Sequence, residues 1–147
     1  MEHEYKVDRT GWSRGPWDNE PDRIEWRHAG LPCLIVRSDT TGGLCGYVAV
    51  PNGHPCSNGM SDLDDLRVHG GVTYTCLGCA GPICHVPQDD ESTDIFWIGF
   101  DCSHAGDLAP YRLRDGSVYR DVAYVRREVE SLAKQLVAYA VESGRSE

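Results

Sequence analysis

The chain has 147 residues, of which 40% are hydrophobic and 25% are charged, and its formal net charge at pH 7 is −9. This balance is typical of one folded domain and excludes a largely disordered chain. The acidic charge argues against binding of duplex nucleic acid, which needs many Lys and Arg contacts to phosphates, and no apolar run approaches the roughly 20 residues of a membrane-spanning helix.

Residues 1–30 are predicted to form an irregular arm, in which three tryptophans stand among glycines, prolines and charged residues. Because tryptophan is mostly buried in folded proteins, we expect the arm to lie on the fold and to bury these rings. An alternative is a nucleotide-like ligand held by the arm, since bases stack on aromatic rings and Arg binds phosphate. The candidates for that role are Trp12, Arg14, Trp17 and Trp26.

Four segments after the arm predict strands. Residues 31–37 and 44–50 are rich in aliphatic and β-branched residues and are separated by turn-forming ones, which predicts a β-hairpin. Residues 67–75 predict a third strand that two glycines interrupt. Residues 94–101 predict a fourth strand, and its nearly continuous apolar run is typical of a central position in a sheet.

The C-terminal part predicts an amphipathic helix over residues 118–142. Its apolar residues recur at alternating spacings of three and four: Val122, Val125, Val129, Leu132, Leu136 and Ala140. The expected fold class is therefore α+β, with a mainly antiparallel sheet of four or more strands, a Trp-rich N-terminal arm and one long C-terminal helix. We expect a single domain over 1–147, made of the arm 1–30, the sheet and loops 31–107, and the helix.

Seven cysteines are many for a chain of this length. The N-terminus is charged and lacks the apolar core of a signal peptide, so we expect a cytoplasmic protein whose cysteines are free thiols or metal ligands rather than disulfides. Four clustered residues have the types that zinc prefers, and they predict a structural zinc site in this loop: Cys76, Cys79, Cys84 and His85. The alternative is a loop of unligated thiols.

A second polar cluster is predicted at the other end of the same strand pair. If residues 67–75 and 94–101 form a hairpin, Thr75 lies opposite about Asp94, and His69 lies opposite about Phe100. The residues gathered at that end are then His69, Gly70, Gly71, Asp101, His104 and Asp107, with His54 expected to reach them from the loop after the second strand. The two glycines leave room for a ligand beside the backbone. The alternative is that Asp101 and His104 only stabilise a turn.

The segments "GYVAVPNGHP", "VHGGVTY" and "WIGFDCSHAGD" resemble a group of uncharacterised small proteins encoded by bacteriophages and prophages, especially of actinobacteria. The resemblance spans about residues 15–125, and "HGG-x-TY" and "GFDC-x-HAGD" are its most specific parts. It implies a phage accessory protein in the cytosol of the host cell. It also implies that the segments containing His69, Asp101, His104 and Asp107 recur in the group.

Three functions fit these features. The first is binding of a small polar or nucleotide-like ligand, including antagonism of a host defence by sequestering its signal. The second is a metal-dependent hydrolase, because His69, Asp101, His104 and Asp107 could hold a metal ion or activate water. The third is an interaction module that blocks a host protein through its acidic face, which is richest in acids at residues 89–94.

Overall fold

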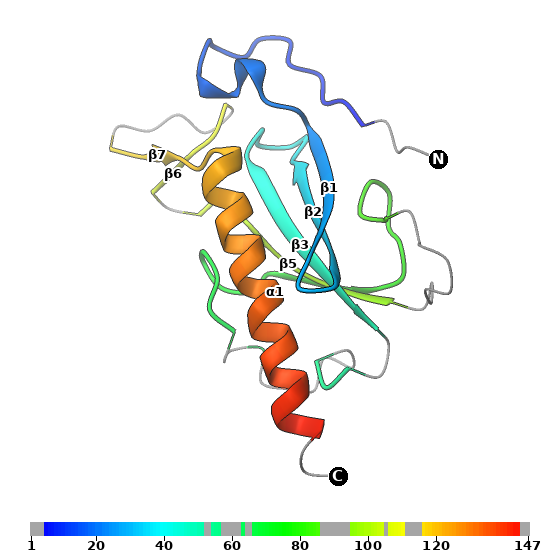
Figure 1. The fold of residues 1–147 in the computed structure, drawn as a ribbon. Coiled ribbons are helices and arrows are strands. Elements are labelled where there is room, and N and C mark those ends of the chain that lie inside the picture. Colours follow the sequence, from blue (N-terminus) through cyan, green and yellow to red (C-terminus); the bar gives the residue numbers. More distant parts are fainter. Residues whose placement is uncertain are drawn as a thin grey trace.

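The computed structural model describes residues 5–51, 54–56, 63, 66–85, 95–104, 106–110 and 116–144, with the side chains of 141–144 excepted. The α+β class is confirmed, as a five-stranded antiparallel sheet with one long C-terminal helix packed on it (Figure 1). The elements are η1 (Pro16–Asn19), β1 (Arg23–His28), β2 (Leu31–Arg37), β3 (Leu44–Pro51), β4 (Tyr74–Leu77), β5 (Ile95–Asp101), β6 (Asp107–Leu108), β7 (Val118–Tyr119) and α1 (Val122–Gly144).

The sheet has the strand order β1-β2-β3-β5-β4, and every neighbouring pair in it is antiparallel. The predicted hairpin of residues 31–37 and 44–50 is present as β2 and β3. The apolar fourth strand is present as β5, which lies between β3 and β4 as its composition indicates. A separate parallel pair, β6 and β7, lies beside the first turn of α1 (Figure 1).

The two faces of the sheet bury different side chains because residues alternate along each strand. One face packs against α1 through residues that include Val48, Ile98 and Phe100 from the sheet and Val125, Val129, Leu132 and Leu136 from the helix. At Gly46, an added Cβ would lie 2.5 Å from Val129 Cγ2 and 2.6 Å from the Phe100 ring, so the helix and the sheet are in close contact there.

The opposite face of the sheet carries a second, smaller core around Trp97, Leu34 and Tyr47. Tyr5 from the arm and Ile83 from the cysteine loop pack against this core. The arm therefore covers only part of this face.

Two predicted boundaries are wrong. Residues 23–28 are strand β1 rather than part of an irregular arm, because polar and apolar residues alternate in this segment and Ile24 and Trp26 pack toward the α1 side. The helix begins at Val122 rather than at residue 118, because Val118 and Tyr119 pair with Asp107 and Leu108 as strand β7. This pairing fixes the start of α1 close to residue 107.

A buried ionic network ties the arm to the sheet and to the start of the helix. The side chain of Arg37 is fully buried, and it donates hydrogen bonds to Asp22 Oδ1 at 2.8 Å and to the Tyr119 hydroxyl at 2.9 Å. Glu20 accepts from Tyr119 and also caps the backbone N–H of Val122 at 2.9 Å. Burial tends to raise the pKa of Asp22, but hydrogen bonds from the Val7 amide, Arg9 and Arg37 outweigh burial and lower it.

Candidate functional site

The predicted register between the third and fourth strands is wrong by four residues. Thr75 lies opposite Ile98 instead of Asp94, and β4 begins only at Tyr74. Gly70 and Gly71 both have positive φ, at 70° and 84°, so the chain turns there instead of continuing as a strand. His69 consequently lies in a turn, past the end of β5 rather than beside Phe100.

The turn nevertheless brings His69 to the segment that follows β5. His69 Nε2 lies 2.9 Å from both carboxylate oxygens of Asp107, and His69 Nδ1 lies 2.8 Å from the hydroxyl of Tyr124 on α1. The backbone N–H of His69 also donates to Glu128 Oε1 at 2.8 Å. Both ring nitrogens and the backbone of His69 are therefore held in place by side chains from two elements, β6 and α1.

Asp107 is the buried centre of this site, with a side chain only 1% exposed. Besides contacting His69, it accepts hydrogen bonds from Arg120 Nε and from the backbone N–H of His104, each at 3.0 Å. Burial would raise the pKa of Asp107, but the hydrogen bonds from His69, Arg120 and the His104 amide outweigh burial and hold its pKa below the usual range of an aspartic acid. Asp107 is thus a carboxylate at neutral pH.

His104 lies over the same carboxylate with its ring 35% exposed. Its Nδ1 atom is shielded from solvent and has no hydrogen-bond partner in the described part of the chain. That atom lies 3.6 Å from Asp101 Oδ1 and 3.7 Å from Asp107 Oδ2. Asp101 is itself oriented by Thr73, whose hydroxyl donates to it at 3.0 Å. His104 therefore aims an unsatisfied nitrogen at two carboxylates.

Gly70 allows this close approach. An added Cβ at Gly70 would lie 2.3 Å from His104 Cε1, whereas a Cβ at Gly71 would meet no atom within 4 Å. The glycine pair was predicted to leave room for a ligand, but the space beside Gly70 is filled by the ring of His104; a ligand beside Gly71 stays a prediction.

The structure joins four of the predicted residues, His69, Asp101, His104 and Asp107, with Gly70 beside them. Helix α1 and the residue pair before it add three that the sequence analysis missed: Arg120, Tyr124 and Glu128. Tyr124 and Glu128 lie four residues apart on one face of α1, and Arg120 precedes Tyr124 by the same spacing just before the helix; this regular spacing of polar residues is the signal that could have revealed them. Arg120 supplies a cation, which the segment from 68 to 111 lacks in sequence.

Three of these residues could hold a metal ion. One ligand atom each from His69, His104 and Asp107 lies within 4.8 Å of the others. Ligands of a tetrahedral zinc ion are about 3.4 Å apart, given metal–ligand bonds of about 2.1 Å. The distances of 2.9 Å and 3.7 Å from Asp107 to the two histidines bracket that value.

The surroundings of His69 suit a metal ligand. A ligating histidine usually donates its second ring N–H to a neighbouring oxygen, which fixes the tautomer that leaves the other nitrogen free to bind. Burial raises the pKa of Tyr124, as does the nearby charge of Glu128, so its hydroxyl is neutral and can accept from His69 Nδ1–H. That tautomer leaves the Nε2 lone pair for a metal ion, which would take the place of the proton that Nε2 donates to Asp107 at 2.9 Å.

Other predicted residues lie elsewhere. His54 Nε2 is 2.9 Å from the carbonyl oxygen of Leu136, which is about 18 Å along the helix from Tyr124 at 1.5 Å per residue, so His54 does not join the site. Cys102, from the same motif, faces the core, and burial raises the pKa of its thiol well above neutrality. The acidic run 89–94 lies outside the described residues.

The tryptophans of the arm have structural contacts. Trp17 is buried against the edge of Tyr119, and Trp26 lies under the guanidinium of Arg126 at 4.7 Å. The guanidinium of Arg9 lies 5.2 Å from the ring centroid of Trp12. Arg14 is 94% exposed and pairs with Asp18. The four arm candidates therefore do not converge on one site, and the predicted stacking of a base on them stays a prediction.

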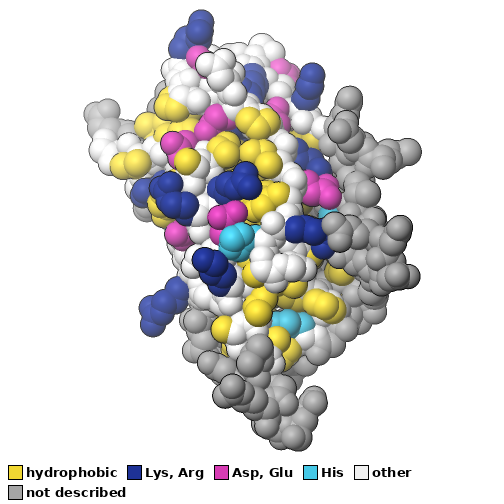
Figure 2. Space-filling model, in the orientation of Figure 1, with side chains coloured by type: hydrophobic (Ala, Val, Ile, Leu, Met, Phe, Trp, Pro, Cys, Tyr) yellow, Lys and Arg dark blue, Asp and Glu magenta, His cyan; other side chains and the backbone are white. Residues whose placement is uncertain are grey.

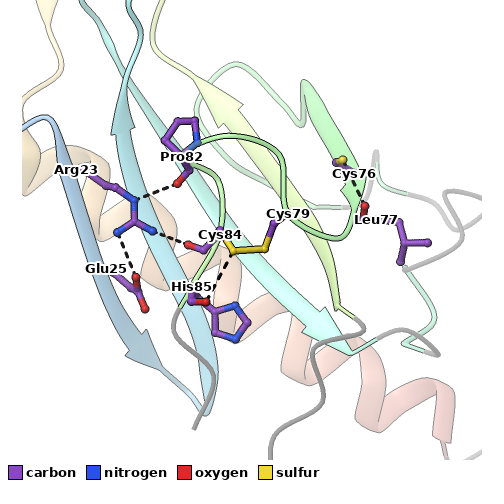
Figure 3. Close-up of a disulfide and its surroundings, with 8 residues drawn as sticks. All are labelled: Arg23, Glu25, Cys76, Leu77, Cys79, Pro82, Cys84 and His85. Atoms are coloured by element: carbon purple, nitrogen blue, oxygen red, sulfur yellow. Dashed lines mark hydrogen bonds and ion pairs between the residues drawn. A yellow bond between two sulfur atoms is a disulfide. The ribbon is translucent and has the colours of Figure 1, made fainter. Parts of the chain in front are cut away.

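The cysteine loop contains a disulfide rather than four clustered ligands. Cys79 and Cys84 are bonded, with their Cα atoms 4.8 Å apart, so the expectation of free thiols is wrong for this pair. Cys76 lies apart from the disulfide, beside Leu77 (Figure 3). The ring of His85 packs against Trp97 in a T-shaped arrangement. Arg23 of β1 donates to the carbonyl of Pro82 at 3.0 Å and anchors the loop. Zinc binding by this loop stays a prediction, and it requires reduction of the disulfide.

Comparison with protein-family models, with curated proteins and with solved structures finds no match to this chain. Within the described residues, none of the helical structure is long and apolar enough to cross a bilayer. On the face of the molecule that carries α1, basic, acidic, apolar and histidine side chains are intermingled (Figure 2). The function therefore has to be inferred from the geometry of the site.

Proposed function

We propose that this chain binds one divalent transition-metal ion, of the zinc class, through His69, His104 and Asp107, and holds a small polar ligand at the metal. The observation that carries the proposal is the convergence of two imidazole nitrogens on one buried carboxylate. Imidazole and carboxylate are common ligands of zinc, and three protein ligands leave a coordination position open for water or a ligand.

The unsatisfied nitrogen of His104 supports this proposal independently of the cluster. A buried polar atom without a hydrogen bond is destabilising, so such atoms usually have a partner. A metal ion between His104 Nδ1 and Asp107 Oδ2, which are 3.7 Å apart, would supply that partner. The ring of His69, held through Tyr124, would present its Nε2 to the same ion.

The test is a titration of metal-free protein with Zn²⁺, followed by calorimetry and by metal analysis after desalting. We expect one equivalent to bind to the wild type and His104→Ala to lose at least tenfold in affinity. The control is His28→Ala, since His28 is a half-exposed residue of β1 that contacts Glu130 instead. Zinc binding that is equally strong in His104→Ala, or absent in the wild type, would overturn the proposal.

Hydrolysis is the second candidate function, and the position of Arg120 favours it. A metal-bound water is acidified and becomes a nucleophile near neutral pH, and a neighbouring cation stabilises the charge that develops on the substrate. Arg120 Nε contacts Asp107 at 3.0 Å, so its guanidinium is beside the proposed metal position. Chromatography of candidate ligands after long incubation with the zinc-loaded protein separates binding from turnover. Turnover that survives chelation of the metal would exclude this mechanism.

The phage resemblance gives the proposal a setting. A small accessory protein that binds a polar or nucleotide-like molecule tightly would antagonise a host defence by sequestering its signal. Tight binding without turnover supports sequestration, whereas turnover supports hydrolysis.

A further inference from the structure

We infer that the ligand of this site is a phosphate group, either free or as a phosphate ester, and that it binds only when the metal is present. The inference rests on the proposed metal site. It is carried by the position of Arg120 and by the charges around the cluster.

Two contacts hold the guanidinium of Arg120 beside the site. Its Nε donates to Asp107 Oδ1 at 3.0 Å, and its guanidinium carbon lies 5.1 Å from the centroid of the Tyr124 ring. Among the described residues, only Nε of this guanidinium has a hydrogen-bond partner, and the side chain is 27% exposed. The two outer nitrogens are therefore available as a planar pair of donors, which is the geometry that binds phosphate in a bidentate manner.

The charges explain why the metal must come first. Among the described residues, the charged side chains that contact the three proposed ligands or Tyr124 are the carboxylates of Asp101, Asp107, Asp121 and Glu128 and the guanidiniums of Arg120 and Arg127. These four carboxylates and two guanidiniums leave a surplus of two negative charges, which repels an anion. A divalent ion offsets this surplus of negative charge and also offers a coordination position to a phosphate oxygen.

This order of binding can be tested with zinc-loaded, desalted protein and with metal-free protein. The probes are inorganic phosphate and adenosine 5′-monophosphate, with adenosine as the ligand that lacks the phosphate. We expect calorimetry to show binding of both phosphate probes to the zinc-loaded protein, at least tenfold weaker binding to metal-free protein, and no binding of adenosine. Binding of free phosphate alone would assign the site to the free ion, whereas tighter binding of the nucleotide would assign it to an ester.

The variant that isolates the inference is Arg120→Gln, compared with the wild type at saturating zinc because Arg120 also contacts the ligand Asp107. With the metal site filled, it should lose at least tenfold in phosphate affinity, while Arg120→Lys, which keeps the charge but not the planar donor pair, should show an intermediate loss. The control is Arg126→Gln on the same helix, because Arg126 contacts Trp26 and Glu130 instead of the cluster.

The possible failures are distinguishable. A protein that binds zinc at His104 but binds neither phosphate probe, or whose Arg120→Gln variant binds phosphate like the wild type, overturns this inference and leaves the metal site intact. A protein that binds no zinc overturns the proposed function itself. Equal binding of phosphate by metal-free and zinc-loaded protein contradicts the charge argument.

Discussion

The glycine pair before β4 allows the geometry of the site to be tested with a matched pair of variants, Gly70→Ala and Gly71→Ala. Both glycines have positive φ, so an alanine at either position carries the same kind of backbone cost, about 1–2 kcal/mol. Only at Gly70 does the new methyl group collide with a neighbour, since it would lie within 2.3–3.0 Å of three atoms of the His104 ring. At Gly71 it enters open space.

The two variants should therefore lose similar stability but differ in metal binding. The His104 ring is one-third exposed and can swing away from the methyl group, which relieves the collision at little cost in folding free energy. The swing moves Nδ1 away from Asp107 and removes one of three ligands. Disturbing the groups that orient a metal ligand typically costs 10–100-fold in affinity, so Gly70→Ala should lose at least about tenfold, or about 1.4 kcal/mol.

Urea unfolding measures the loss of folding stability that both variants share through the backbone at positive φ. Zinc titration measures the loss of metal affinity that should follow only from displacement of the His104 ring. The reasoning is refuted if Gly71→Ala weakens zinc binding as much as Gly70→Ala does. It is equally refuted if Gly70→Ala binds zinc like the wild type, because the contact between residue 70 and the His104 ring would then have no role in the site.

Three further predictions concern the buried network and the cysteines. Arg37→Met should lower the free energy of unfolding by about 3 kcal/mol, because it removes one of the two guanidiniums that pair with the buried carboxylate of Asp22. Arg14→Met, on an exposed pair, should leave the urea midpoint unchanged. The pKa of Asp22 is lower in the folded protein than in the unfolded chain, so its contribution to stability is full at neutral pH and is lost as the pH falls through about 4 and below. Urea midpoints between pH 7 and pH 3 should show this loss of stability. In Asp22→Asn, the urea midpoint should depend less on pH over the same range. Alkylation of the denatured, unreduced protein should label five cysteines. Cys79 and Cys84 should be labelled only after a dithiol reductant opens the disulfide between them. Labelling of all seven cysteines without reductant would show that this pair is reduced.

The sequence predicted the strands that have a simple pattern. Residues 31–37 form β2 with the expected bounds, and the apolar run before Asp101 forms the central strand β5. The first strand was missed although its residues alternate, because the prolines and tryptophans before it suggested an irregular arm through residue 30. Its partner is the most regular strand of the sheet, and this tertiary pairing overrides the local composition.

The convergence of His69 and Asp107 was predicted, but through a register that is wrong. The predicted pairing extended β4 through the two glycines, whereas their positive φ values end the strand and turn the chain toward the residues that follow β5. The helix was interpreted as packing alone, although one of its faces contributes Tyr124 and Glu128 to the site. Contacts between residues 69 and 124 depend on how the helix crosses the sheet, and the pattern of either segment alone does not contain that information.

The most direct test of the central claim is an anomalous difference map from crystals of the protein soaked with Zn²⁺, measured at the zinc absorption edge. The account predicts one strong peak about 2.0–2.2 Å from His69 Nε2, His104 Nδ1 and a carboxylate oxygen of Asp107. A peak at the thiols of the cysteine loop with none at these three residues, or an empty map, would contradict it.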